Sequence, residues 1–166
     1  MNNYYNFLEK ISPKNYFLKL CFFGFVCFFI SILINSTITY FFEFNIENNS
    51  GTLLIIKKNK IIHFGLTVLI GPLTESFLFQ WLPLFFYSEY KLTKKNDVLF
   101  AVVLSLIFGV LHYYNIGYQI STTIIGFFYI SLTMYYESKK MNYFFPVFFI
   151  HFMNNLFVFL FAVYKK

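Results

Sequence analysis

Apolar residues occur in long runs along this chain, and polar residues gather between the runs. Five runs approach the roughly 20 residues that a bilayer-spanning helix needs. They cover residues 16–40, 61–86, 98–114, 117–136 and 142–164. A further run at 52–56 is too short to cross and lies in a polar loop. The pattern predicts an all-α polytopic membrane protein of about five transmembrane helices, in which a functional site would be buried in the helix bundle.

The polar stretch before residue 61 divides the chain into two parts. We expect residues 1–60 to hold an N-terminal transmembrane helix and a polar loop, and residues 61–166 to hold the core with the functional groups. No small-residue cleavage site follows a short apolar core near the N-terminus, so the first run is expected to be an uncleaved span. A tight turn is expected at 115–117, between the third and fourth spans.

Composition supports a membrane location. The chain is 58% hydrophobic and only 12% charged, whereas a soluble domain has about 25% charged residues. Its net charge of +6 comes entirely from lysines placed mainly between the apolar runs, which is typical of topology determinants and excludes a nucleic-acid partner. Lysines are more numerous on the side that the N-terminus would share with the loops at 87–97 and 137–141. We expect a multi-pass protein of a bacterial cytoplasmic membrane, with the lipid bilayer as a partner and a cytoplasmic N-terminus.

Few ionisable residues lie inside the apolar runs, and such residues mark functional sites in membrane proteins. Glu75, His112 and His151 lie on three different predicted helices. Counted at about 1.5 Å per residue from the loops on the N-terminal side, they lie roughly 18, 22 and 14 Å deep. Asn155 follows His151 by four residues and so shares its helix face. His63 falls near the opposite interface and is expected to be solvated.

These groups could hydrolyse an amide bond. A carboxylate beside a histidine can activate a water, while a histidine and an asparagine can donate hydrogen bonds to an oxyanion. Glu75, His112 and His151 could equally bind zinc, leaving a position open for water. Two other possibilities remain open: hydrogen bonds that only join helices, and a proton or ion path. No serine-protease turn, aspartyl motif or His-Glu-x-x-His zinc motif is present.

The motifs around these residues resemble the CPBP family of intramembrane endopeptidases, also called the CAAX protease and bacteriocin-processing or Abi family. The family pattern is a Pro-led Glu-Glu-x-x-x-Arg helix, then Phe-x-x-x-His, then His-x-x-x-Asn or Asp. In this chain the corresponding segments are 72–80, 108–112 and 151–155. The resemblance implies that Glu75 and His112 activate water, that His151 and Asn155 stabilise the oxyanion, and that Phe108 packs behind the site. It also implies a peptide or lipidated protein as substrate, and it leaves metal dependence undecided.

The chain departs from the family pattern at two positions. Ser76 stands where the family has its second Glu, and Gln80 stands where it has Arg. Because they are four residues apart, these neutral side chains can still form a hydrogen-bonded pair across one helical turn, and we infer that the pair is mainly a structural brace. The leading hypothesis is an intramembrane endopeptidase. The alternative is a catalytically inactive relative that acts as an immunity or scaffold factor.

Overall fold

The computed structural model describes residues 6–7, 9–10, 14–42, 59–89, 96–113 and 116–164, and these residues form helices without any strand. The segment at 60–89 is one continuous helix, called here the composite helix. The elements are α2 (Tyr16–Phe42), the composite helix made of α4 (Lys60–Phe64), η2 (Gly65–Ile70), α5 (Gly71–Glu75), η3 (Ser76–Trp81) and α6 (Leu82–Glu89), then α7 (Asp97–Leu111), α8 (Ile116–Ser138) and α9 (Phe144–Tyr164). The all-α prediction is confirmed, and each predicted span corresponds to one helical segment. Residues 43–58 of the expected polar loop, with its short apolar run, lie outside the described residues, and Lys60 already belongs to α4. Of the turn expected at 115–117, residue 115 lies outside the described residues, whereas Ile116 and Gly117 begin α8 and so are helical.

Three helices of the described residues are long and apolar enough to cross a membrane: Tyr16–Ile38, Lys60–Glu89 and Phe144–Phe161. The apolar helix α7 has 15 residues, which gives about 22 Å against a hydrocarbon core of about 30 Å. The longer helix α8 carries polar residues such as Ser121, Ser131 and Thr133, and all three are buried. A helix enclosed by its neighbours can be more polar than a lipid-facing one, because its side chains meet protein.

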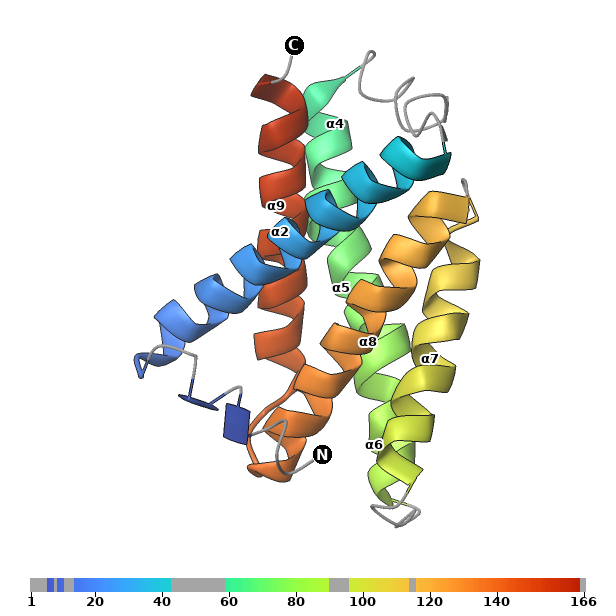
Figure 1. The fold of residues 1–166 in the computed structure, drawn as a ribbon. Helices are drawn as coiled ribbons and strands as arrows, with labels where there is room; N and C mark the ends of the chain where they lie inside the picture. The colour runs from blue at the N-terminus through green and yellow to red at the C-terminus, as the bar shows by residue number, and fades with distance from the viewer. Residues whose placement is uncertain are drawn as a thin grey trace.

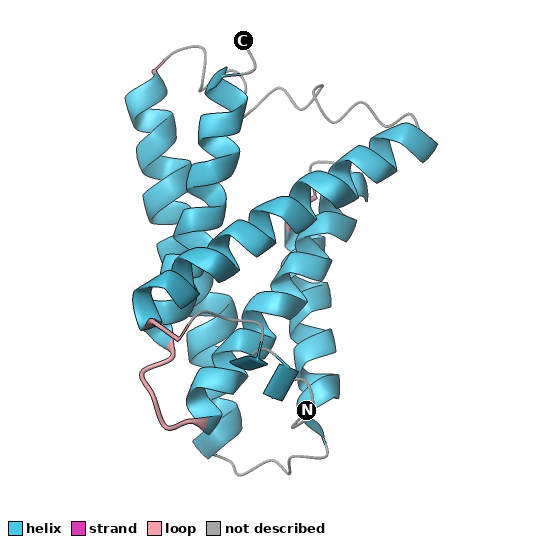
Figure 2. Ribbon diagram, turned by 60° about the vertical axis from the view of Figure 1, so that its left-hand side comes forward, coloured by secondary structure: helices cyan, strands magenta, loops and turns pink. Residues whose placement is uncertain are grey.

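The helices form one bundle in which α2 crosses diagonally over α9 and α8 (Figures 1 and 2). The composite helix runs beside α9, and α7 pairs with α8. The start of α2, the end of α6 and the connection from α8 to α9 lie at one end of the bundle, while the start of α4 and the end of α9 lie at the other (Figure 1). This is the arrangement of ends expected from five successive crossings.

The N-terminal segment is tied to the turn between α8 and α9. Lys139 Nζ lies 2.9 Å from Glu9 Oε1, and the Tyr135 hydroxyl donates a hydrogen bond to the same oxygen at 2.9 Å. The hydrogen bonds from Lys139 and Tyr135 hold the pKa of Glu9 below its usual value. These contacts place the N-terminal segment and the α8–α9 turn at the same end of the bundle.

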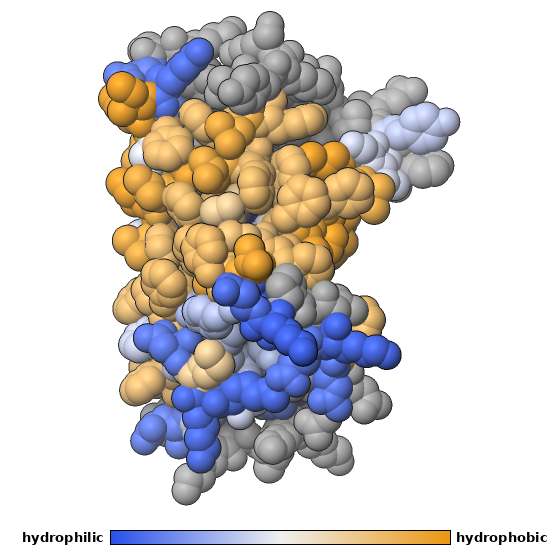
Figure 3. Space-filling model, turned by 90° about the vertical axis from the view of Figure 1, so that its left-hand side faces the viewer, coloured by the Kyte–Doolittle hydropathy of each residue, from blue (hydrophilic) through white to orange (hydrophobic). Residues whose placement is uncertain are grey.

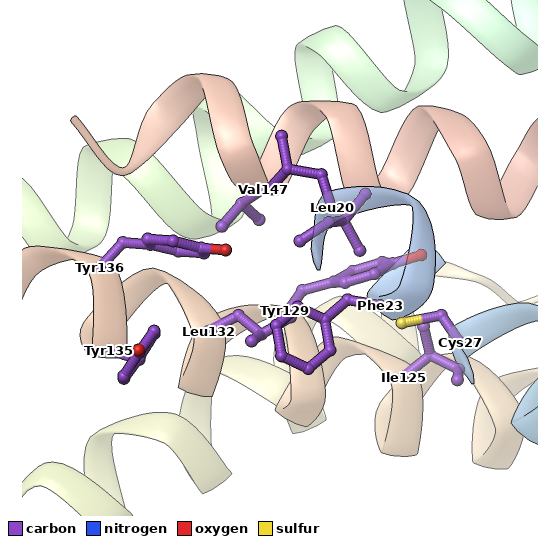
Figure 4. Close-up of a cluster of buried hydrophobic side chains, with 10 residues drawn as sticks. Leu20, Phe23, Cys27, Ile125, Tyr129, Leu132, Tyr135, Tyr136 and Val147 are labelled. Atoms are coloured by element: carbon purple, nitrogen blue, oxygen red, sulfur yellow. The ribbon is translucent and has the colours of Figure 1, made fainter. Parts of the chain in front are cut away.

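The main apolar core lies where α2 meets α8 and α9 (Figure 4). Leu20, Phe23 and Cys27 of α2 are almost completely buried in it. Gly24 permits the close approach, because a Cβ at this position would lie 2.6 Å from the Cβ of Met153. The N-terminal half of α2 is therefore fixed tightly against the bundle. Cys21 and Cys27 are free thiols, as the six-residue spacing within one helix predicts.

Large apolar side chains cover the outside of the bundle. In Figure 3 they form a broad belt, and hydrophilic residues gather below it, at the end where the N-terminal segment and the α8–α9 turn lie. Phe29, Leu33 and Val110 are each about 60% exposed, at 61%, 59% and 64%. So much continuous exposed apolar surface is unfavourable in water and favourable in lipid. The protein is an integral membrane protein.

Candidate active site

The helix that carries Glu75 contains two π-helical turns, η2 and η3, one on each side of α5. Each π turn ends shortly before a proline: η2 ends at Ile70 before Pro72, and η3 ends at Trp81 before Pro83. A proline inside an α-helix lacks an N–H donor and clashes with the carbonyl four residues earlier. A wider π turn relieves that clash, and such turns are frequent at functional sites. The two prolines thus give a local reason for the irregular backbone around Glu75.

Glu75, His112 and His151 meet inside the bundle. The Nε2 atom of His112 and the Nε2 atom of His151 each lie 3.6 Å from Glu75 Oε2. The side chain of His151 is 5% exposed and that of His112 is 15% exposed, while Glu75 keeps 29%. Both histidines therefore approach the same carboxylate oxygen of Glu75. The three ionisable groups that the sequence placed at similar depth meet at the centre of the site.

The backbone fixes how His112 can use its two nitrogens. His112 follows the last residue of α7, and its Nδ1 lies 2.7 Å from the carbonyl oxygen of Phe108. A carbonyl can only accept a hydrogen bond, so Nδ1 must carry the proton. In the neutral imidazole, Nε2 then presents a lone pair toward Glu75. A lone pair and a carboxylate oxygen 3.6 Å apart do not bond to each other, but both can accept from one water placed between them.

His151 has a different partner. Its Nδ1 lies 3.4 Å from the hydroxyl oxygen of Ser76, which is 1% exposed. If the hydroxyl donates to Nδ1, the neutral imidazole carries its proton on Nε2 and donates toward Glu75. The two histidines then show opposite hydrogen-bonding character to the same carboxylate oxygen.

The expected pair between Ser76 and Gln80 does not form. Ser76 contacts His151, whereas the amide of Gln80 is 2% exposed and neither its oxygen nor its nitrogen has a hydrogen-bond partner among the described residues. The π turn η3 begins at Ser76 and changes the spacing of the side chains that follow. The four-residue rule for an α-helix, on which the expectation rested, does not hold across this turn.

Asn155 lies beside the three ionisable groups and also joins two helices. Its Nδ2 donates to the carbonyl of Thr67 at 2.9 Å, and its Oδ1 accepts from Asn154 Nδ2 at 3.2 Å. Thr67 lies in η2, so this contact links α9 to the first π turn. An amide NH₂ has two hydrogens, so one remains for another acceptor after Thr67 takes the first.

A cavity of about 130 Å³ opens beside these groups and is large enough to hold water. Its wall includes Glu75, His112, His151 and Asn155, together with Phe108. The Phe108 ring packs against both histidines, with ring centroids 4.5 Å from His112 and 6.3 Å from His151. The ring is buried and forms the back of the site, in the position that the resemblance implied.

Sequence reasoning missed several residues of the cavity wall. Tyr129 of α8 lies over His151 with ring centroids 4.5 Å apart, and Ser31 and Asn35 of α2 line the same cavity. Tyr118, Thr122, Ile125 and Tyr129 are spaced by four, three and four residues, so helical periodicity could have shown that they share a face.

His63 differs from its expected environment. Its side chain is 6% exposed and its ring stacks on Phe159 with centroids 5.5 Å apart, so it is not solvated. Helix α9 covers this end of the composite helix, which a count of residues along one helix could not reveal. His63 does not line the cavity.

Glu75, His112 and His151 are the side chains that the zinc alternative would use as ligands. Within the part of the chain that the structure describes, no group of three His, Cys, Asp or Glu side chains has the geometry to hold a metal ion. Glu75, His112 and His151 are close together, but they do not form such a group.

A comparison with protein families gives an independent view of the same residues. The family model described as type II CAAX prenyl endopeptidase Rce1-like matches residues 57–157, which is more than half of the chain. The chain belongs to the Rce1-like family. The match includes Glu75, His112, His151 and Asn155 but not α2. Membership agrees with the resemblance seen in the motifs, and it implies a protein or peptide substrate and a membrane environment. No curated protein and no solved structure matches the chain.

Proposed function

We propose that this protein is an intramembrane endopeptidase that hydrolyses a peptide bond of a membrane-associated or lipidated substrate. The observation that carries the proposal is the meeting of Glu75, His112 and His151, from three helices, on the wall of one cavity. Membership of the Rce1-like family supports the reaction class. Buried ionisable groups at such depth in a membrane protein are costly and are typical of functional sites.

The hydrogen bonds of the two histidines support different roles for them. His112 is held by the Phe108 carbonyl with its Nε2 lone pair facing Glu75, so a substrate water can donate one hydrogen to Nε2 and the other to Glu75 Oε2. Both acceptors make the water oxygen a stronger nucleophile. His151, held by Ser76, directs an Nε2–H into the site. That N–H and the second hydrogen of the Asn155 amide stabilise the oxyanion.

The reaction balances without another reactant. The water oxygen attacks the peptide carbonyl carbon while Glu75 takes a proton, and the C=O bond becomes a C–O⁻ held by His151 and Asn155. When the oxyanion collapses, the C–N bond breaks and the leaving nitrogen takes the proton that Glu75 holds. The products are a carboxyl group and an amine, and Glu75 returns to its starting state.

The departures at Ser76 and Gln80 are compatible with this chemistry. Both residues are neutral, so neither buries an unpaired charge. Ser76 provides a contact to His151 that does not require a second carboxylate. We infer that Ser76 positions a histidine, and that loss of the second Glu does not remove the general base.

The experiment compares peptide termini in membranes from cells that express the wild type, Glu75→Gln or Glu89→Gln, at expression levels matched by immunoblot. Glu89 ends the same composite helix and is exposed, so Glu89→Gln is the matched control. We expect new termini with the wild type and with Glu89→Gln, and their loss with Glu75→Gln. Because Glu75 is the proposed base, turnover should fall by at least about 100-fold.

The opposite result would identify the alternative function. If the wild type and Glu75→Gln give identical termini, and the cellular phenotype is also unchanged, Glu75 is not a catalytic base. The chain would then be a catalytically inactive member of the family that acts as an immunity or scaffold factor.

A further inference from the structure

Asn154 is not one of the residues that the sequence singled out, yet it contacts the proposed oxyanion donor Asn155. Its Nδ2 donates to Asn155 Oδ1 at 3.2 Å, and both side chains line the active-site cavity. Consecutive side chains on a helix point about 100° apart and seldom meet. Because Asn154 is only 6% exposed, a second polar side chain is buried on this stretch of α9, at a cost that hydrogen bonds must offset.

The backbone carbonyl of Thr67 sets the direction of these hydrogen bonds. A carbonyl can only accept, so Nδ2 of Asn155 must face it, and the two atoms are 2.9 Å apart. The Oδ1 of Asn155 then faces Asn154, which must present its own Nδ2 there. A reversed Asn154 amide would place two oxygens against each other. Neither amide can therefore be reversed without losing a hydrogen bond.

Tyr129 of α8 lies at the other end of this row of polar groups. Its hydroxyl interacts with the Asn154 side chain. Both this hydroxyl and Asn154 Oδ1 are buried, and within the described part of the chain neither atom has another hydrogen-bond partner. An amide oxygen can only accept and a hydroxyl can donate, so the two atoms are complementary. When they pair, the hydrogen bonds run in one direction from α8 through α9 to η2.

We propose that Asn154 is a positioning residue that fixes the plane of the Asn155 amide with its second hydrogen facing the oxyanion, and that Tyr129 orients Asn154. The inference rests on the proposed function, because the oxyanion forms only if a peptide bond is hydrolysed. Contacts at both ends of the Asn155 amide define its plane, whereas the Thr67 contact alone would let the amide pivot. A hydrogen bond accepted at Oδ1 also polarises the amide and strengthens its N–H donors.

A purely structural role for Asn154 makes different predictions. Buried asparagines can join membrane helices by hydrogen bonds, and a residue of that kind would affect the stability of the bundle. A positioning residue instead affects kcat and leaves KM unchanged, because the oxyanion forms after the substrate has bound. Its effect also disappears once Asn155, through which it acts, has been removed.

Steady-state kinetics of the full-length protein in nanodiscs test the proposal. The probe is a synthetic peptide with a fluorophore and a quencher that spans the cleavage site found by the comparison of termini, with any lipid attached there. Asn154→Leu keeps the volume, Asn154→Gln keeps the amide, and Tyr129→Phe keeps the ring over His151. Asn155→Leu removes the proposed donor. Asn96→Ala is the control, because Asn96 is exposed before α7 and its side chain does not cap that helix. Thermal unfolding shows whether each variant is folded.

The expected losses are graded by distance from the oxyanion. Asn155→Leu should lower kcat about 100-fold, because it removes a donor to the oxyanion. Asn154→Leu should lower kcat about tenfold and change KM by less than about twofold, and Asn154→Gln should recover part of the rate. Tyr129→Phe should lower kcat about threefold, since Asn154 then loses the bond that orients it. Adding Asn154→Leu to Asn155→Leu should cost less than about a further twofold, and the control should match the wild type.

Three results would overturn the positioning role: wild-type kcat in Asn154→Leu, a loss in KM instead of kcat, or a tenfold loss that persists when Asn155 is already absent. If Asn154→Leu does not fold, Tyr129→Phe decides, and wild-type kcat in that variant would contradict the proposal. Failure of the proposed function is a separate result, because Glu75→Gln would then yield the same termini as the wild type. Loss of turnover in Glu75→Gln with wild-type kcat in Asn154→Leu would refute only the positioning role.

Discussion

At the scale of single residues, the two histidines of the site differ because their neighbours differ. The Phe108 carbonyl can only accept, and it forces the His112 proton onto Nδ1. The Ser76 hydroxyl can donate, and it allows the His151 proton to stay on Nε2. In the proposed mechanism, one histidine thus accepts from the nucleophilic water while the other donates to the oxyanion, although both face Glu75 Oε2 at 3.6 Å.

The contact between Ser76 and His151 gives the first prediction. Ser76→Ala should lower kcat about tenfold, because loss of one donor leaves the His151 tautomer undefined. Ser76→Thr keeps the hydroxyl and should recover part of the rate. The tautomer itself is read from ¹⁵N NMR of the imidazole nitrogens, which is practical because the chain has three histidines.

The control for this prediction is Ser88→Ala, which removes an exposed hydroxyl near the end of the same composite helix. It should change neither kcat nor the histidine spectra. Wild-type kcat and an unchanged His151 tautomer in Ser76→Ala would rule out the positioning role. A rate gained only in Ser76→Glu would instead show that the chain has lost a carboxylate it once needed.

At the scale of elements, the composite helix contains a proline directly after a wide π turn. Pro72 is buried at the start of α5, directly after η2. The π turn exposes the Thr67 carbonyl to Asn155 of α9, so the irregular backbone also anchors the side chain that we propose as an oxyanion donor. The same helix therefore positions Glu75 directly and Asn155 through its backbone.

Replacing Pro72 tests this coupling. Pro72→Ala restores an N–H donor and removes the clash with the preceding turn, so the helix itself should gain up to about 3 kcal/mol of intrinsic preference. Closure of the π turn to α-geometry would rotate the residues on its two sides relative to each other by as much as about 100°. We expect unchanged or higher thermal stability with at least a tenfold loss of turnover.

Pro146→Ala is the matched control, because Pro146 lies in the first turn of α9, where proline is tolerated. Its turnover should stay near wild type. Thermal unfolding and turnover are measured on the same preparations. Full activity in Pro72→Ala would mean that the π turn does not position Glu75.

The sequence predicted the helices, and it predicted that the three ionisable groups lie at similar depth, for a clear physical reason. Apolar runs reveal spans directly, and charged groups inside them are rare enough to stand out, as Glu75 does. The π turns were not predictable from the pattern, because a single inserted residue leaves the apolar run unchanged. Ser31 and Asn35 were missed because small polar residues are ordinary in spans, and only the packing of α2 shows which face they occupy.

At the scale of the whole molecule, the apolar belt and the grouped ends define how the protein sits in a bilayer. The N-terminal segment, joined to the α8–α9 turn through Glu9 and Lys139, lies at the hydrophilic end below the belt (Figure 3). Asn59, which caps the start of α4, lies at the opposite end of the bundle (Figure 1). The excess of lysines near the N-terminal end predicts that this end faces the cytoplasm.

Labelling of single cysteines from the two faces of the membrane tests this orientation. Lys10→Cys and Lys140→Cys should react with an impermeant maleimide only after the cells are opened, and Asn59→Cys should react in intact cells. The wild type is the control, because Cys27 is buried and Cys21 lies within the span of α2.

Reaction of Lys10→Cys and Lys140→Cys from opposite faces would contradict the bundle, since the contact between Glu9 and Lys139 joins their segments. Reaction of both in intact cells, with Asn59→Cys protected, would keep the bundle but invert it.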